Sequence, residues 1–184
     1  MATRSKTKAE PQLKIDIGLT DEQRQGSIEI LNTTLCDLHV LYIKTRNYHW
    51  NVVGPHFYSL HGLFEEQYNT LAESIDLIAE RIRMAGGIAM GSMEEFIRNS
   101  RLKEHKGEPP NARDMVLDLL HDHEMMVRCL RQDIETLDSE YNDVTNADVL
   151  TAQAEIHEKM AWMLAAIAAD DHSLDHQNSG NGRR

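Results

Sequence analysis

Four long segments of the chain repeat apolar residues at intervals of three and four, and this pattern constrains the fold more than any other feature. Such spacing places the apolar side chains on one face of an α-helix. Each helix must bury that face against a neighbour, so the pattern predicts an all-α bundle. We expect the helices over about 21–51, 57–85, 111–138 and 145–170.

The breaks between these segments predict how the helices connect. Gly54-Pro55 ends the first helix and leaves only a tight turn before the second. A connection of about 25 residues precedes the third helix, and within it Ser92 opens a stretch typical of one short capped helix. A crossover this long lets the second and third long helices lie parallel, as in the ferritin-like form of a four-helix bundle.

Composition defines the ends of the bundle and excludes several classes of protein. Polar residues dominate 1–18 and 172–184, so we expect flexible tails there and one bundle domain over 19–171. The formal net charge of −11 argues against a nucleic-acid-binding surface on the body of the molecule. Cys36 and Cys129 form no disulfide framework, and no apolar run reaches the ~18 residues of a membrane span. We therefore expect a cytoplasmic protein with no membrane contact.

Imidazoles and carboxylates are concentrated in the stretch YHWNVVGPHFYSLHGLFEE and along the helix that follows. His61 and Glu65 are four residues apart, as are Asp76 and Glu80, so each pair shares one helix face. Oxygen and imidazole ligands suit iron, manganese or zinc. The alternative is a solvated helix face whose carboxylates pair with nearby arginines.

The two pairs are too far apart to form one site in a single chain. Glu65 and Asp76 are about 16 Å apart along the helix axis, whereas a metal ion needs ligands within ~2.0–2.3 Å. If two copies of this helix meet antiparallel at a two-fold axis, the His61 pair of one chain faces the Asp76 pair of the other. His49, at the end of the first helix, could add an imidazole. The chain has no Glu-x-x-His sequence, which argues against an intrachain di-iron centre.

Residues 47–87 resemble the signature of the Dps family, the ferritin-like DNA-protecting proteins of starved cells. The resemblance continues through SMEEFI and EIHEKMAWMLAAI and covers about residues 25–170. It implies a hollow homo-dodecamer whose ferroxidase centres lie between two subunits. Where the family usually has Asp, this chain has Glu65, one methylene longer. The metal ligands that the resemblance implies are His49, His61 and Glu65 from one chain with Asp76 and Glu80 from its neighbour.

The resemblance also implies an activity. Such proteins oxidise Fe(II), preferably with hydrogen peroxide, store the ferric mineral in the bacterial cytoplasm or nucleoid, and so protect DNA from oxidative damage. Zinc would compete for the same ligands. Trp50, beside His49, is either an electron donor for any radical that forms or a packed interface aromatic.

Two further groups of residues are candidates for metal contacts. The acids between the third and fourth long helices line an iron-entry pore in this family, and a solvated acidic turn is the alternative. An accessory zinc or iron site near the C-terminus is another hypothesis, against simple fraying of the helix end. Three other histidines, His121, His123 and His157, are expected to be core or surface residues. The pore candidates are Asp138, Asp143 and Asp148, and the accessory candidates are His172 and His176.

Two other functions remain open on sequence grounds. One is a DNA-compacting protein with weak ferroxidase activity, in which the cationic residues of the tails bind phosphates weakly, without sequence specificity and in a salt-dependent way. The other is a zinc or copper store that uses the same ligands without redox turnover.

Overall fold

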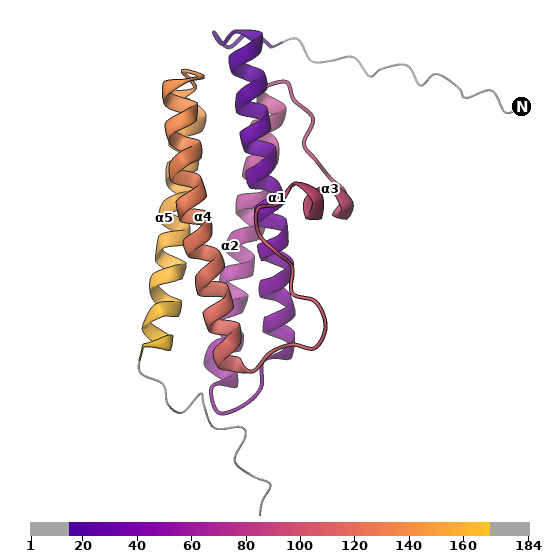
Figure 1. Cartoon of the computed structure of the whole chain (residues 1–184), viewed down its shortest axis with the longest axis vertical. Helices are drawn as coiled ribbons and strands as arrows, with labels where there is room; N and C mark the ends of the chain where they lie inside the picture. The colour runs from indigo at the N-terminus through magenta and orange to yellow at the C-terminus, as the bar shows by residue number, and fades with distance from the viewer. Residues whose placement is uncertain (1–14, 170–184) are drawn as a thin grey trace, which may run out of the picture.

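The described part of the chain is built from α-helices (Figure 1). The computed structural model describes residues 15–169, and this part contains no β-strand. The long helices agree within a few residues with the segments expected from apolar spacing, so the prediction of an all-α bundle is confirmed. The helices are α1 (Asp21–Asn51), α2 (Phe57–Met84), α3 (Met93–Asn99), α4 (Ala112–Ser139) and α5 (Val144–Ala168).

Side chains just before α1 and α3 explain where these helices begin. The Thr20 hydroxyl accepts a hydrogen bond from the backbone N–H of Gln23, and the Gln23 side chain accepts one from the Thr20 N–H. Ser92 and Glu95 form the same reciprocal pair ahead of α3. Each pair satisfies N–H groups that the first turn of a helix leaves without partners, so the chain carries a capping box at both positions.

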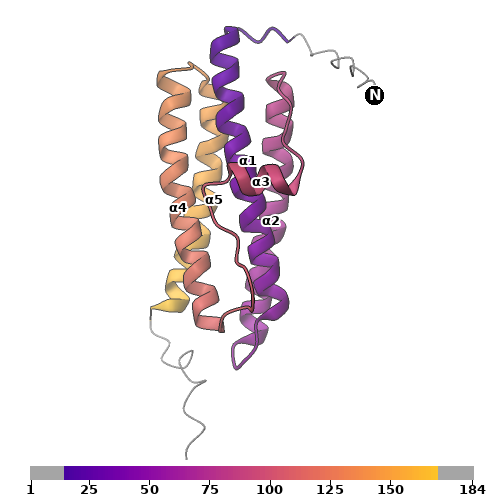
Figure 2. The ribbon, with the colours of Figure 1, turned by 45° about the vertical axis from the view of Figure 1, so that its right-hand side comes forward.

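The long helices form two antiparallel hairpins joined by a long connection (Figure 2). α1 packs against α2, and α4 packs against α5. The connection that joins the hairpins contains α3, which lies across α1. Lys44 contacts Asp122 while Tyr48 contacts Asp118, so α1 and α4 run antiparallel. α2 and α4 are therefore parallel, which is the ferritin-like arrangement that the crossover length indicated.

The apolar faces of the four long helices meet in one continuous core. Each fully buried aliphatic or aromatic side chain stabilises the fold by ~1.5–3 kcal/mol relative to exposure. Cys36 and Cys129 are both buried and free, as expected from their spacing. The largest fully buried side chains are Tyr48, Phe64, Leu31, Leu35, Leu38, Leu41, Leu60, Leu71, Ile78, Ile82, Met115 and Leu119. Over residues 15–169, no helix is long and apolar enough to cross a membrane.

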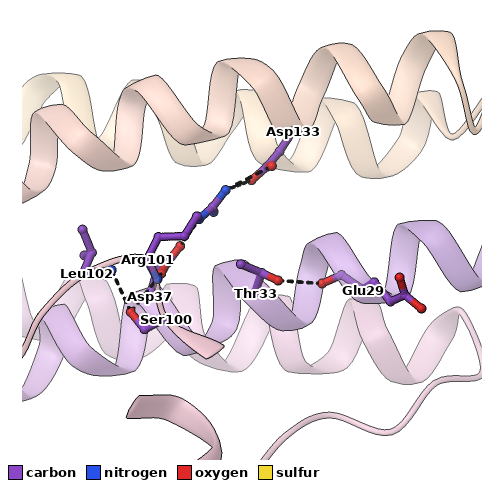
Figure 3. Close-up of polar contacts among 7 residues, drawn as sticks. All are labelled: Glu29, Thr33, Asp37, Ser100, Arg101, Leu102 and Asp133. Carbon is purple, nitrogen blue, oxygen red and sulfur yellow. Dashed lines mark hydrogen bonds and ion pairs between the residues drawn. The ribbon is translucent and has the colours of Figure 1, made fainter. Parts of the chain in front are cut away.

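Arg101 fastens the connection to both hairpins (Figure 3). Its Nε lies 2.7 Å from a carboxylate oxygen of Asp37 on α1, and its Nη1 lies 2.9 Å from Asp133 on α4. Asp37 is fully buried and also accepts hydrogen bonds from the Ser100 hydroxyl and the Arg101 backbone N–H. A buried carboxylate is tolerated only when it is paired and hydrogen-bonded in this way. The network therefore holds the connection against the bundle.

A second charged network lies inside the bundle, between α1 and α4. Lys44 is only 5% exposed, and its Nζ lies 2.7 Å from Asp122 and 3.2 Å from Asp118. Burial raises the pKa of the Asp122 carboxyl, while the hydrogen bond and charge of Lys44 oppose that rise. The ammonium group of Lys44 therefore compensates a carboxylate that burial alone would neutralise.

Candidate metal centre

The turn between α1 and α2 brings two histidines together. His49 lies in the last turn of α1, and His61 lies near the start of α2. Gly54 between them has a φ of 109°, a conformation that a side chain would disfavour, so glycine allows the chain to reverse here. The two imidazole rings stack with their centroids 3.7 Å apart and their planes at 22°.

The backbone of the neighbouring helix fixes each imidazole. Nδ1 of His49 lies 2.8 Å from the carbonyl oxygen of His61, and Nδ1 of His61 lies 2.9 Å from the carbonyl oxygen of His49. A carbonyl oxygen only accepts hydrogen bonds, so Nδ1 carries the proton in both rings. A neutral imidazole with its proton on Nδ1 has its free lone pair on Nε2, which is the form in which histidine binds a metal ion.

Two further aromatic rings extend the stack. Phe57 lies against His61 with the ring centroids 4.9 Å apart, and Tyr68 meets His49 at 5.1 Å with the planes at 78°. The four rings come from α1 and α2 and restrict one another's rotation. Both Nε2 lone pairs are thus presented from positions set by packing, which is how a metal site is preorganised.

Glu65 supplies a carboxylate beside the histidines. It lies one turn along α2 from His61 and is exposed. Its Oε1 lies 3.4 Å from the hydroxyl of Tyr68. We call His49, His61 and Glu65 the half-site, since the two imidazoles stack on each other and Glu65 lies on the same face of α2 as His61.

Asp76 and Glu80 lie further along α2 and are exposed. Asp76 is about 16 Å beyond Glu65 at the rise of an α-helix. Among residues 15–169, no group of three or more His, Cys, Asp or Glu side chains is arranged to hold a metal ion. If these two carboxylates share a centre with the half-site, they must come from a second copy of the chain.

Arg46 connects the half-site to Trp50. Its guanidinium carbon lies 4.9 Å from the ring centroid of Trp50, 5.3 Å from that of Tyr68 and 5.5 Å from that of Tyr42. Trp50 itself is 61% exposed. Neither Arg46 nor Tyr68 was predicted from the sequence. The spacing of Tyr42, Arg46 and Trp50 four residues apart on one helix was the available signal, and Tyr68 follows Glu65 by three.

The three acids predicted to line a pore differ in how exposed they are. Asp143 is 5% exposed and caps α5, because its two oxygens accept hydrogen bonds from the backbone and side-chain nitrogens of Asn146. Within one chain, this carboxylate is thus occupied by capping, whereas Asp138 and Asp148 are exposed. A pore formed by the three acids stays a prediction. His172 and His176 lie outside the described residues.

His123 and His157 are core residues, which is one of the two positions expected for them from the sequence. Both are fully buried, and their Nδ1 atoms lie 2.8 Å apart between α4 and α5. Burial lowers the pKa of His157 to about 4 and holds the pKa of His123 well below its usual value, with a further contribution from His157. Both rings are therefore neutral at pH 7, one donating to the other.

Comparison with known proteins defines the class to which this chain belongs. Residues 28–173 match the ferritin-like domain family. A protein of Nostoc sp., known as an uncharacterized low temperature-induced protein, is 52% identical over 154 residues, which span 84% of this chain and 86% of that protein. DNA protection during starvation protein 2 of Bacillus anthracis is 40% identical over 141 residues, spanning 76% of this chain and 94% of its own.

Solved structures of similar fold are also ferritin-like, and those named here are Dps proteins. DpsC from Streptomyces coelicolor matches with a TM-score of 0.84 and 26% identity, over 91% of this chain and 98% of its own. A Dps protein from Vibrio cholerae, described as a member of the ferritin-like diiron-carboxylate superfamily, matches with a TM-score of 0.78 and 32% identity, over 84% and 96%. On this sequence and structural evidence, the chain belongs to the Dps family.

Proposed function

We propose that the protein is a ferroxidase that oxidises Fe(II), preferentially with hydrogen peroxide, and stores the ferric product in a hollow dodecamer. The half-site is the observation that carries this proposal. Two imidazoles with their Nδ1 protons held by backbone carbonyls present free Nε2 lone pairs beside an exposed carboxylate. Imidazole and carboxylate together are suitable ligands for iron.

We propose further that Asp76 and Glu80 of a second subunit complete each centre. Surface composition supports a subunit contact at the α1–α2 turn, where Val53 is 65% exposed, Phe57 44% and Tyr58 90%. Contiguous exposed apolar side chains of this size are typical of an interaction surface. A two-fold contact that pairs antiparallel α2 helices would cover these side chains and form two identical centres per dimer.

The reaction takes two Fe(II) ions and one hydrogen peroxide as substrates. Each Fe(II) loses one electron, the O–O bond breaks, and peroxide takes up two electrons and two protons to leave as two water molecules. The role of the protein is to hold both ions beside one peroxide, so that the one-electron route to hydroxyl radical is avoided. Trp50 is our candidate electron donor for any radical that does form. It follows His49 in the chain, and its ring contacts Arg46.

Charge supports iron rather than DNA as the main partner of the folded body. The net charge of −11 attracts Fe²⁺ and repels phosphate. Asp138, Asp143 and Asp148 are the acids that we propose for an entry pore, in which Asp143 also caps α5. Relatives are named for DNA protection, and we propose that this protein protects DNA chiefly by removing iron and peroxide.

The decisive experiment is oxidation of anaerobically loaded Fe(II), followed by ferric absorbance, in the wild type and in His61→Ala. Peroxide is added at one molecule per two Fe(II), and air is the comparison. We expect fast oxidation with peroxide, slow oxidation with air, and loss of the fast phase in the variant. No acceleration over protein-free iron, or an unaffected variant, would refute the proposal. Metal binding without peroxide consumption would indicate a zinc or copper store.

A further inference from the structure

Tyr68 lies between two residues of the half-site and contacts both. Its ring meets His49 edge-on at a centroid distance of 5.1 Å, and its hydroxyl lies 3.4 Å from Oε1 of Glu65. Neither the ligand pattern nor the family resemblance assigns this residue a role. Its position one turn beyond Glu65 places it on the face of α2 that carries His61 and Glu65.

The direction of the Tyr68 hydrogen bond is fixed by chemistry. An ionised carboxylate only accepts hydrogen bonds, so the Tyr68 hydroxyl donates and must keep its proton. At 3.4 Å the hydrogen bond is long, so it restrains Oε1 without immobilising it.

The Tyr68 ring also contacts the guanidinium group of Arg46. The Arg46 guanidinium carbon lies 5.3 Å from the ring centroid, within the range of a cation–π contact. Arg46 is anchored in turn, because its Nη1 donates a 2.8 Å hydrogen bond to the Tyr42 hydroxyl. Tyr68 therefore presents its hydroxyl from a ring fixed between His49 and Arg46.

Glu65 needs such a restraint more than an aspartate would. It has one more rotatable bond and is exposed, so an unrestrained side chain would sample several rotamers. A metal ligand has to lie within ~2.0–2.2 Å of the ion, and ordering a mobile carboxylate at that distance weakens binding. We infer that Tyr68 is a positioning residue that holds Oε1 of Glu65 and leaves Oε2 to bind the metal. This inference rests on the proposed function.

Tyr68→Phe tests the inference because it removes the hydroxyl and keeps the ring against His49 and Arg46. Tyr141→Phe is the matched control, since it removes a tyrosine hydroxyl from the turn between α4 and α5, which packs near the start of α1, at the opposite end of that helix from His49. Anaerobic Co(II) serves as the probe, with affinity from calorimetry and ligand geometry from the visible absorption bands. We expect about tenfold weaker Co(II) binding and shifted bands in Tyr68→Phe, the low end of the range for groups that orient a metal ligand. Tyr141→Phe should match the wild type.

A double-mutant cycle distinguishes positioning from packing. Glu65→Asp withdraws the carboxylate from the hydroxyl, so adding Tyr68→Phe should weaken Co(II) binding no further. The inference would be overturned if Tyr68→Phe reduced Co(II) affinity equally in the wild type and in Glu65→Asp. It would also be overturned if Tyr68→Phe kept the Co(II) affinity and the visible absorption bands of the wild type. His61→Ala separates the two proposals. If it does not reduce Co(II) binding, the metal centre itself is wrong; if it does while Tyr68→Phe has no effect, only the role of Tyr68 is wrong.

Discussion

His49 and His61 are joined by two reciprocal hydrogen bonds. Nδ1 of His49 donates to the backbone carbonyl of His61 at 2.8 Å, and Nδ1 of His61 donates to the backbone carbonyl of His49 at 2.9 Å. The acceptors are main-chain atoms, so the turn between α1 and α2 sets the orientation of both rings. Neither ring needs a bound metal to adopt its tautomer. The half-site is therefore preorganised by the fold, which lowers the conformational entropy lost on metal binding.

His61→Asn should separate ring orientation from metal binding. The Asn amide nitrogen can replace Nδ1 as donor to the His49 carbonyl, but nothing in Asn replaces Nε2. We expect the free energy of unfolding to stay within about 1 kcal/mol of wild type. Co(II) affinity, measured by calorimetry, should fall at least about tenfold.

His61→Gln is the complementary variant. Its longer side chain carries an amide oxygen near the position of Nε2 and has no donor at the position of Nδ1. We expect residual Co(II) binding together with a loss of about 1 kcal/mol of stability, measured by denaturant unfolding. Equal Co(II) affinities in the Asn and Gln variants would contradict the assignment of Nε2 as the metal ligand.

Arg101→Ala should loosen the connection that joins the two hairpins. Asp37 is fully buried and would lose its cation, although the Ser100 hydroxyl and a backbone N–H remain as donors. Breaking a buried ion pair costs about 3–5 kcal/mol, and these remaining donors favour the lower end. Hydrogen exchange should become faster over residues 100–110. Arg98→Ala, an exposed change on α3, is the control, and unchanged exchange in Arg101→Ala would disprove the anchoring role.

The helices could be predicted from the sequence because apolar spacing and capping residues act locally. Ser92 caps α3, as its sequence context indicated, and Thr20 caps α1 with the same kind of capping box. Spacing also identified His61 and Glu65 as neighbours, since a helix places such residues on one face. The stacking of His49 on His61 depends on how the Gly54 turn closes, and the sequence does not specify that angle.

Contacts between residues far apart in the chain could not be predicted, because they depend on how the helices pack. Lys44 and Asp122 are far apart in the chain, and either residue alone resembles a solvated charge. Only the packing of α1 against α4 makes them a buried pair. Arg46 was missed similarly, since its role depends on Tyr68 from α2 lying against α1.

Lys44→Met should destabilise the protein strongly at pH 7. Methionine preserves the length and apolar contacts of the side chain but leaves the buried Asp122 carboxylate without its 2.7 Å partner. We expect a loss of about 3–5 kcal/mol by denaturant unfolding. Lys103→Met, at an exposed position, should change stability little. A Lys44→Met/Asp122→Leu double variant should recover part of the loss, and no recovery would mean that lost packing, not the unpaired charge, is the cause.

The buried pair of His123 and His157 should make the protein sensitive to mild acid. Burial lowers the pKa of His157 to about 4 and the pKa of His123 well below its usual value, whereas both titrate near 6.5 in the unfolded chain. As pH falls below about 6.5, the unfolded state takes up two protons that the folded state excludes. Stability is therefore lost as pH falls from 6.5 toward 4, and the contribution of His157 alone is about 2 kcal/mol at pH 5. The contribution of His123 has the same sign.

Comparison with a His123→Leu/His157→Leu double variant isolates this contribution. Burial raises the pKa of Asp122 and of Asp133, so these carboxyls favour the folded state as pH falls and oppose the effect of the histidines. The carboxyls remain in both proteins, and their contribution cancels in the difference. We expect the free energy of unfolding of the wild type, relative to the variant, to fall by at least about 2 kcal/mol, the share of His157, from pH 7 to pH 5 at one protein concentration. A difference that does not change with pH would show that the folded protein accepts these protons.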